Sequence, residues 1–286
     1  MKYVVLGSSG LLGKSLIKVG KKRNLNVLGL SRKNKKYKFD FLKVKKLFNL
    51  LNKIKPQIII NAAGIVNIDF CENNVREIMK INAISLKFLA EFSRKNNVKL
   101  VQISTDHFFT DDENKKHKEN SKIKIMNQYA KSKFLSEKNT KKHKNHIIIR
   151  TNFTGFRGDP KKQTFIEWLL KNFKEKKKVS LFRDFYCSTI DVETLAHIIY
   201  DLIDVKFTGL INIGSNDVFS KKQFAKKIIK ILGLNDELII DGSVKTLKTK
   251  RANSLGLNVS KVEKVLKYKM PSMNQVCKNL IRNLKK

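Results

Sequence analysis

The first residues carry the pattern that most restricts the fold. An apolar run ending at Leu6 leads straight into Gly-Ser-Ser-Gly-Leu-Leu-Gly, with glycines at positions 7, 10 and 13, and apolar residues then recur at helical spacing. A strand, a glycine-rich turn and a helix in this order bind the pyrophosphate of dinucleotides. The bare turn admits the phosphates, and the N-terminus of the helix attracts negative charge. The alternative is a strand-to-helix turn that binds nothing.

The chain is strongly basic, and lysine is the cause. Its formal net charge is +37, and only nine of the 61 basic residues are arginines. The lysines are spread along the whole sequence, and no helix-turn-helix, zinc-finger or aromatic RNA-binding pattern accompanies them. We attribute the excess to compositional drift toward Lys, Asn, Ile and Phe, and we predict no nucleic-acid partner. Such a surface still attracts anionic ligands, including nucleotides, at low salt.

Cysteine and histidine show no metal-binding pattern. The three cysteines and five histidines lack the paired spacing of a zinc site, so no metal is predicted. Sparse cysteines in odd number suit a reducing compartment. No apolar stretch is long enough to cross a bilayer, and the first strand starts too early to leave room for a signal peptide. We therefore expect a cytoplasmic protein without a membrane partner.

Strands and helices alternate through the first half of the sequence. Such alternation is typical of a parallel sheet with helices on both faces. The predicted fold class is therefore α/β, a Rossmann-type doubly wound parallel sheet with a smaller α+β substrate-binding portion formed mainly by the C-terminal part. The expected strands are 27–30, 58–60, 100–103 and 146–150, and the expected helices are 76–94 and 128–137.

The second half is less regular but contains two capping-box patterns. Ser220 with Gln223 and Ser260 with Glu263 each place a hydroxyl three residues before a Glu or Gln and ahead of an apolar run, which predicts helix starts. Gly233 is expected to close the first of these helices. Further helices are expected at 165–173 and 191–202, and a strand within 209–214.

No linker rich in Gly, Ser or Pro marks a domain boundary. We assign residues 1–150 to a dinucleotide-binding Rossmann domain, to which residues 188–213 return. Residues 151–187 and 214–286 are assigned to the substrate-binding portion.

The most specific chemical pattern is a tyrosine and a lysine four residues apart, Tyr129 and Lys133. On a helix both lie on one face. A nearby ammonium lowers the pKa of a phenol, so that the tyrosine exchanges protons near neutral pH. Thr105 follows strand 100–103 at the carboxyl edge of the sheet, which is the functional edge of such folds, and could hydrogen-bond the same substrate oxygen. The alternative is that Tyr129 and Lys133 are an incidental pair without a catalytic role, in a chain rich in lysine.

These motifs together make the chain resemble a known superfamily. The glycine turn, Asn-Ala-Ala-Gly at 61–64, Ser-Thr-Asp at 104–106 and the Tyr-x-x-x-Lys pair are similar to those of an extended short-chain dehydrogenase/reductase. Within that superfamily the chain is most similar to the dTDP-4-dehydrorhamnose reductase family, over nearly its whole length. The resemblance implies an NAD(P)-dependent oxidoreductase that reduces a keto-sugar nucleotide with NADPH or NADH, in deoxysugar or surface-polysaccharide biosynthesis. It leaves the oligomeric state open and allows a homodimer.

The resemblance also implies roles for single residues. Thr105 would orient the carbonyl, Tyr129 would donate the proton, and Lys133 would lower the tyrosine pKa and hold the nicotinamide ribose. The cofactor residues would be Gly7, Ser9, Gly10, Leu11, Leu12 and Gly13 at the pyrophosphate, Ser31 and Arg32 after the second strand, Asp40 and Phe41 beside the adenine, and Ala62, Ala63 and Gly64 near the ribose and nicotinamide, together with Tyr129 and Lys133. The substrate residues would be Ser104, Asp106, His107 and Phe153, with a plain core phenylalanine as the alternative for the last.

The end of the second strand bears on the choice of cofactor. No acidic residue stands at Ser31-Arg32 to bind a ribose 2′-hydroxyl. Arg32 could pair with a 2′-phosphate instead, which favours NADPH over NADH. A solvated surface arginine is the alternative.

Two other functions fit the same pattern. A nucleotide-sugar dehydratase or epimerase shares the fold, but relatives that dehydrate usually carry Thr-Asp-Glu, and His107 stands in the third place here. A non-catalytic NADP-binding regulatory subunit is the second, and the joint presence of Thr105, Tyr129 and Lys133 argues against it. The sugar, the nucleotide base and the carbon that is reduced stay open.

Overall fold

The structure is a computed structural model that describes residues 1–110 and 115–284. Its internal contacts divide the chain into two units. The predicted division into a cofactor-binding and a substrate-binding portion stays a prediction. The first unit consists of Met1–Thr105, Asn127–Arg150 and Ala196–Ile211, and the second of Asp106–Met126, Thr151–Leu195 and Asn212–Lys286.

A six-stranded sheet with the order β10-β5-β4-β3-β1-β2 forms the centre of the first unit. Neighbouring strands from β2 to β5 pair in parallel, which confirms the predicted α/β fold class. Because β2 lies on one side of β1 and β3 on the other, the strand order reverses at β1. Open α/β sheets bind ligands at the carboxyl ends of the strands at such a point. The strands are β1 (Lys2–Leu6), β2 (Asn26–Leu30), β3 (Ile58–Asn61), β4 (Lys99–Ile103), β5 (His146–Thr151) and β10 (Gly209–Ile213).

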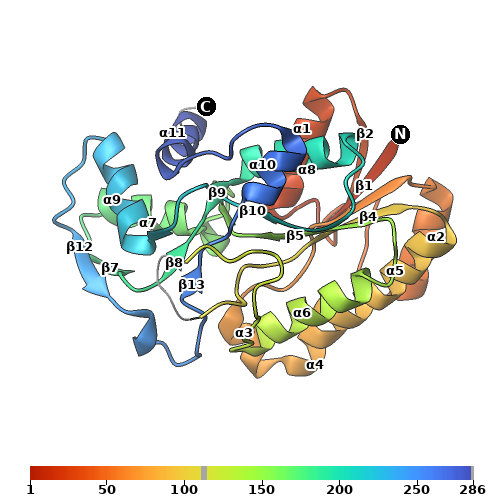
Figure 1. Ribbon diagram of the computed structural model, residues 1–286, viewed down its shortest axis with the longest axis horizontal. Coiled ribbons are helices and arrows are strands. Elements are labelled where there is room, and N and C mark those ends of the chain that lie inside the picture. The colour runs from red at the N-terminus through yellow and green to blue at the C-terminus, as the bar shows by residue number, and fades with distance from the viewer. Residues whose placement is uncertain (111–114, 285–286) are drawn as a thin grey trace. The chain divides into compact units, whose positions relative to one another are not determined.

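Helices cover both faces of this sheet. Figure 1 shows α1 and α8 on one side, and α2, α5 and α6 on the other. The helix expected at 76–94 is present, but its middle, Met79–Ile84, is a π-helical turn between α4 and α5. The helices are α1 (Leu11–Lys22), α2 (Val44–Ile54), α3 (Ile68–Asn73), α4 (Val75–Ile78), α5 (Ser85–Lys95), α6 (Gln128–Thr140) and α8 (Val192–Asp204).

The glycine turn allows α1 to pack closely on β1. Gly7 has φ +83°, a conformation that side chains disfavour. A Cβ at Gly13 would lie 2.2 Å from the Gly7 carbonyl oxygen, so only glycine allows the first turn of α1 to approach this closely. Every residue of β3 is buried. A central strand of a parallel sheet is buried in this way because helices cover both faces of the sheet.

The described residues of the second unit form three small sheets and a set of helices. Its strands pair as β11-β8-β13, β12-β7 and β6-β9. The stacked rings of Phe219 and Phe224, with centroids 5.4 Å apart, join β11 to α9 in its core. The strands are β6 (Phe153–Thr154), β7 (Val179–Phe182), β8 (Tyr186–Cys187), β9 (Ile190–Asp191), β11 (Phe219–Ser220), β12 (Ile239–Gly242) and β13 (Ser254–Leu255), and the helices are α7 (Phe165–Lys174), α9 (Lys221–Ile231), α10 (Ser260–Leu266) and α11 (Met273–Leu284).

Both predicted helix starts are confirmed, but only one of the two capping boxes forms. Ser220 and Gln223 exchange both capping hydrogen bonds at the start of α9, which Gly233 follows at φ +69°. In α10 the N-cap is Val259, and Ser260 is already helical. The carboxylate of Glu263 accepts a hydrogen bond from the backbone N–H of Met270 at 2.9 Å, so a contact outside the helix occupies the side chain that the box requires.

Replacing Gly13 by alanine tests the close packing of α1. The added Cβ would force the backbone apart, and we expect the free energy of unfolding to fall by about 1–3 kcal/mol, as overpacking usually does. Gly10→Ala is the matched control, because its Cβ would meet the same Gly7 oxygen at 3.2 Å and should cost less. Urea denaturation followed by circular dichroism measures both. Equal stability of Gly13→Ala and the unmodified protein would contradict this account of the turn.

Candidate active site

Two loops converge where the strand order reverses. The backbone N–H groups of Gly7 and Ser8 both donate to the carbonyl of Leu30, at 2.9 and 3.1 Å, which ties the glycine turn to the end of β2. A Cβ on Gly7 would come within 2.8 Å of the Ala63 backbone, so the turn also lies directly against the loop after β3. The predicted pyrophosphate and ribose segments are therefore neighbours at the carboxyl edge of the sheet.

The N-terminus of α1 is suited to an anion. Gly10 is its N-cap, and among the described residues no side chain caps it and no acidic residue stands in its first turn. The N–H groups and the positive end of the helix dipole therefore favour a phosphate. Ser9 is exposed at this turn, whereas Leu12 and Gly13 are buried in the packing of α1. The bare turn and the helix N-terminus fit the pyrophosphate of a dinucleotide.

Buried asparagines fix the loop after β3. Asn61 donates to the side chain of Gln102 on β4 at 2.8 Å and accepts from the backbone N–H of Ala63 at 3.2 Å. Asn82, in the π-helical turn, holds Ile65 from both sides, accepting from its N–H and donating to its carbonyl at 2.8 Å each. Both asparagines are fully buried, and the sequence reasoning missed the part played by Asn82.

Asn82 also connects this loop to α6. Its amide donates to the hydroxyl of Ser132 at 3.1 Å, and Ser132 donates to the carbonyl of Tyr129 at 2.8 Å. The predicted ribose loop and the helix that carries Tyr129 and Lys133 are thus joined through one side chain. Such a fully satisfied buried network holds its members rigidly.

The loop after β2 presents Arg32 to solvent. Ser31 is buried, and its backbone N–H and carbonyl bond to Tyr37 and Phe39. Asn34 organises the loop by donating to the carbonyl of Gly29 at 2.8 Å and accepting from two N–H groups within the loop. Arg32 is exposed on this ordered loop.

The two residues predicted beside the adenine differ in exposure. Asp40 is half-buried, and its carboxylate accepts from the N–H of Leu42 at 3.0 Å. Phe41 is buried and meets the ring of Phe39 edge-on, with centroids 4.9 Å apart. Phe41 therefore belongs to the apolar core beneath α2 and α5.

Helix α6 carries the predicted catalytic pair in a buried setting. Asn127 caps its N-terminus by accepting from the N–H of Ala130 at 2.9 Å. Tyr129 packs against Ile68, Cys71 and Ile78. Lys133 is only 6% exposed and donates to the carbonyl of Ile103, at the end of β4, over 2.5 Å. Burial lowers the pKa of Lys133 to about 8, although the carboxylate of Glu137 acts to raise it.

A buried ion pair lies one turn further along α6. Glu137 accepts from Nε and Nη2 of Arg150, at 2.9 and 2.8 Å, and from the hydroxyl of Ser104 at 2.6 Å. The glutamate and the arginine are 1% and 2% exposed. The sequence reasoning did not predict this pair. Its one local signal was the position of Glu137, a turn after Lys133.

The remaining predicted residues lie on both sides of the division between the units. Thr105 is buried and is the last residue of its segment of the first unit. Asp106 and His107 begin the next segment, which belongs to the second unit, and His107 lies near the ring of Phe185, with centroids 6.0 Å apart. Phe153, also in the second unit, is half-buried on β6, where it pairs with Ile190 of β9.

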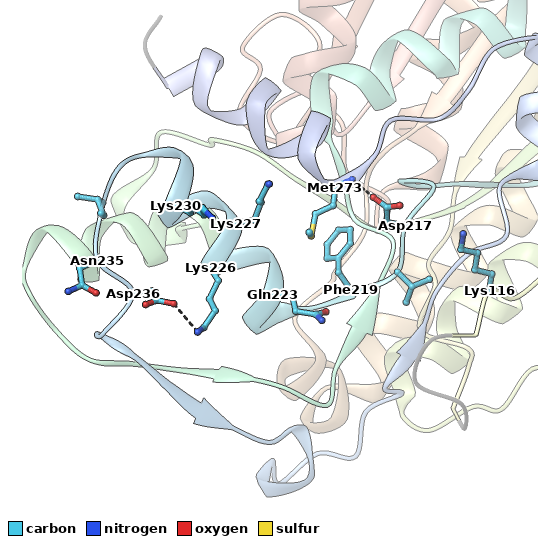
Figure 2. Close-up of a pocket in the computed structure, with 12 residues that line it drawn as sticks. Lys116, Asp217, Phe219, Gln223, Lys226, Lys227, Lys230, Asn235, Asp236 and Met273 are labelled. Carbon is cyan, nitrogen blue, oxygen red and sulfur yellow. Dashed lines mark hydrogen bonds and ion pairs between the residues drawn. The ribbon is translucent and has the colours of Figure 1, made fainter.

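The second unit also contains an open cavity of about 1080 Å³ beside α9. Figure 2 shows Lys226, Lys227 and Lys230 on the helix, with Phe219 and Met273 nearby. Lys226 is paired with Asp236 at 2.8 Å. The residues lining the cavity are Lys116, Asp217, Val218, Phe219, Gln223, Lys226, Lys227, Lys230, Leu234, Asn235, Asp236 and Met273, and none is a predicted site residue.

The whole chain, residues 1–286, matches the model of the RmlD substrate binding domain family, and the protein belongs to this family. This is a family of NAD(P)-dependent reductases in the extended short-chain dehydrogenase/reductase superfamily, so the predicted resemblance and the oxidoreductase class are confirmed. Its members are linked to nucleotide sugars and polysaccharide biosynthesis.

Individual relatives agree with this membership. The chain is 23% identical over 285 residues to the probable low-salt glycan biosynthesis reductase Agl14 of Haloferax volcanii, covering 96% of this chain and 95% of that one. It is 27% identical over 201 residues to dTDP-4-dehydrorhamnose reductase of Salmonella typhimurium, covering 68% and 64%. The dTDP-4-dehydrorhamnose reductase of Bacillus anthracis in complex with NADP has the same fold, with a TM-score of 0.89, 24% identity, and coverage of 99% and 100%.

The described part of the chain contains no helix of the length and apolar character required to cross a membrane.

The environment of His107 predicts an unusual titration. Burial, helped by the positive charges of Arg251 and Lys221, lowers its pKa from 6.5 to about 3. The neutral ring therefore stabilises the fold above pH 6.5, and this contribution is lost as the pH falls toward 3. In an NMR titration, we expect the His107 ring signal, assigned by its loss in His107→Gln, to stay unchanged from pH 8 to about 5, where an unperturbed histidine would titrate. A midpoint near 6.5 would contradict this environment.

Proposed function

We propose that this protein reduces the keto group of a nucleotide-linked sugar, with NADPH or NADH as the reductant. One observation carries the proposal. The helix with Tyr129 and Lys133 is bonded to the end of β4, directly before Thr105, in the same unit as a bare glycine turn at the point where the strand order reverses. Its relatives named as reductases of dTDP-4-dehydrorhamnose and of glycan biosynthesis support this choice of substrate class.

Different residues of the first unit bind the cofactor, orient the substrate carbonyl and transfer the proton. The turn at Gly7 and Gly10 and the N-terminus of α1 hold the pyrophosphate. When bound, the nicotinamide supplies the hydride. The Thr105 hydroxyl orients the substrate carbonyl, and the phenol of Tyr129 gives its proton to the carbonyl oxygen. Lys133, which is an ammonium below pH 8, lowers the pKa of that phenol and holds the nicotinamide ribose.

The properties of His107 favour reduction over dehydration. Relatives that dehydrate usually place a glutamate at this position, to serve in the elimination. A histidine whose pKa is lowered to about 3 is neutral at pH 7 and carries no proton that it can readily give up as an acid. The regulatory-subunit alternative is less favoured, because Thr105, Tyr129 and Lys133 are present together, at the end of β4 and on α6.

Several finer assignments stay predictions. These are the contacts of Ser104, Asp106, His107 and Phe153 with the substrate, the cytoplasmic location, a homodimer, and the lack of a nucleic-acid partner.

The cofactor preference can be tested at Arg32. If its guanidinium pairs with the 2′-phosphate of NADPH, Arg32→Ala should weaken NADPH binding by about 1.5–3 kcal/mol, the range for a hydrogen bond to a charged group. NADH binding should hardly change. Lys36→Ala is the control, because Lys36 is an exposed cation of the same loop. Fluorescence titration with both cofactors measures the effect. An equal loss in the two variants, or for the two cofactors, would show that Arg32 contributes only general charge.

Tyr129→Phe tests the chemistry directly. The substitution keeps the ring and removes the transferable proton, and general acid–base groups contribute roughly 10²–10⁴-fold. We expect kcat to fall by about that factor in NADPH oxidation with a panel of 4-keto-6-deoxy sugar nucleotides. NADPH affinity should stay nearly the same.

Tyr200→Phe is the matched control for this variant. Tyr200 is a fully buried tyrosine of the same unit, and its hydroxyl donates to the Leu16 carbonyl at 2.8 Å. We expect it to lose stability but to retain kcat. A Tyr129→Phe enzyme as active as the unmodified protein would refute the proposed acid. A protein that binds NADPH and reduces nothing in the panel would favour the regulatory alternative.

A further inference from the structure

Three elements of the first unit meet at one residue, Ser104. Its backbone N–H donates to the carbonyl of Ile149 on β5 at 2.7 Å. Its hydroxyl donates to Glu137 on α6 at 2.6 Å. Arg150, the residue after Ile149, completes the triangle by donating two hydrogen bonds to Glu137. The end of β4 is thus bonded to both its neighbouring strand and the helix, directly before Thr105.

A second bond from α6 reaches β4 one residue earlier. Lys133 Nζ donates to the carbonyl of Ile103 at 2.5 Å, one helical turn before Glu137. Residues 103 and 104 are therefore both held by α6, at two successive turns of the helix. This pair of bonds sets the position of Thr105 relative to the helix that carries Tyr129 and Lys133.

We propose that Glu137, held by Arg150 and Ser104, is a positioning residue that aligns Thr105 with the Tyr129 and Lys133 helix for hydride transfer to the sugar. The proposal rests on the function proposed above. It extends that function to Glu137, Arg150 and Ser104, which bond to one another in this network. The Glu137 carboxylate joins the end of β4 to α6.

The chemical nature of the Glu137–Arg150 ion pair supports a positioning role rather than a role in packing alone. Burying a carboxylate and a guanidinium is unfavourable unless the geometry is excellent, and an apolar pair of similar volume often stabilises a core as well. An apolar pair makes no directional hydrogen bonds, so it cannot fix the orientation of a neighbouring group. The planar fork of Arg150 holds both carboxylate oxygens of Glu137 in one plane, which leaves the carboxylate a fixed orientation toward Ser104.

The first test removes only the link from the strand. In Ser104→Ala the ion pair stays intact, and we expect kcat with the 4-keto-6-deoxy sugar nucleotide panel to fall by roughly tenfold to a hundredfold, as small displacements of reacting groups do. NADPH affinity should stay within about twofold. Ser136→Ala is the matched control. Ser136 is equally buried, but its hydroxyl donates to the Lys133 carbonyl within α6 at 2.7 Å, so we expect kcat to be retained.

A second variant separates positioning from a direct contact between Ser104 and the substrate. Glu137→Met with Arg150→Met removes the joint, leaves the Ser104 hydroxyl in place and leaves neither member of the ion pair alone in the core. Because the Glu137 carboxylate also acts to raise the pKa of Lys133, kcat is compared across pH, where a lower Lys133 pKa would shift the profile and a lost alignment would lower it at every pH. We expect thermal stability close to that of the unmodified protein and the same fall in kcat, with little change in KM. A double variant that keeps the kcat of the unmodified protein would overturn the proposal.

Amide hydrogen exchange gives a readout that needs no substrate. We expect both Ser104→Ala and the double variant to exchange the amides of residues 104 and 105 roughly tenfold faster than Ser136→Ala. Unchanged exchange there would overturn the proposal whatever the activity. Failure of the proposed function would appear instead as full activity in Tyr129→Phe, or as no activity in the unmodified protein.

Discussion

The absence of side chains at Gly7 and Gly13 is the constraint on which the first unit depends. A Cβ at Gly13 would lie 2.2 Å from the Gly7 oxygen, and one at Gly7 would lie 2.8 Å from Ala63. Without these atoms, β1, α1 and the loop after β3 converge where the strand order reverses. Gly10, between these two glycines, is the N-cap of α1 and leaves its N-terminus without a side-chain cap from the described residues. The glycines of one turn therefore serve both the packing of the fold and the binding of an anion.

Buried polar side chains then fix the segments around this point. Asn61 and Asn82 hold the loop after β3, and Glu137 holds the end of β4 on α6. Each has partners for its buried oxygens, and a satisfied network in a low-dielectric interior is rigid. A reduction in which a hydride donor and a proton donor act on the same carbonyl requires such rigidity, because both donors must be aligned with that one group. The apolar core supplies stability, and these polar contacts supply alignment.

Much of the local structure in both units could be predicted, because its signals lie close together in the sequence. The β-branched runs at 58–60 and 147–149 form buried strands, and the box of Ser220 and Gln223 starts α9. Tyr129 and Lys133 lie on one helix, as their spacing predicts. The resemblance to a reductase family, carried by short motifs in a fixed order, is confirmed by the match over the whole chain.

Only the tertiary structure decided the contacts that reach beyond a single helix or strand. Glu263 bonds to Met270 rather than completing a capping box, and Asn82 reaches both Ile65 and α6. The sequence determined that Lys133 stands one turn after Tyr129. Its depressed pKa depends on burial by other elements, which no spacing along the chain encodes. Periodicity reports the neighbours along a helix or strand, whereas desolvation and long-range hydrogen bonds exist only once those elements have packed.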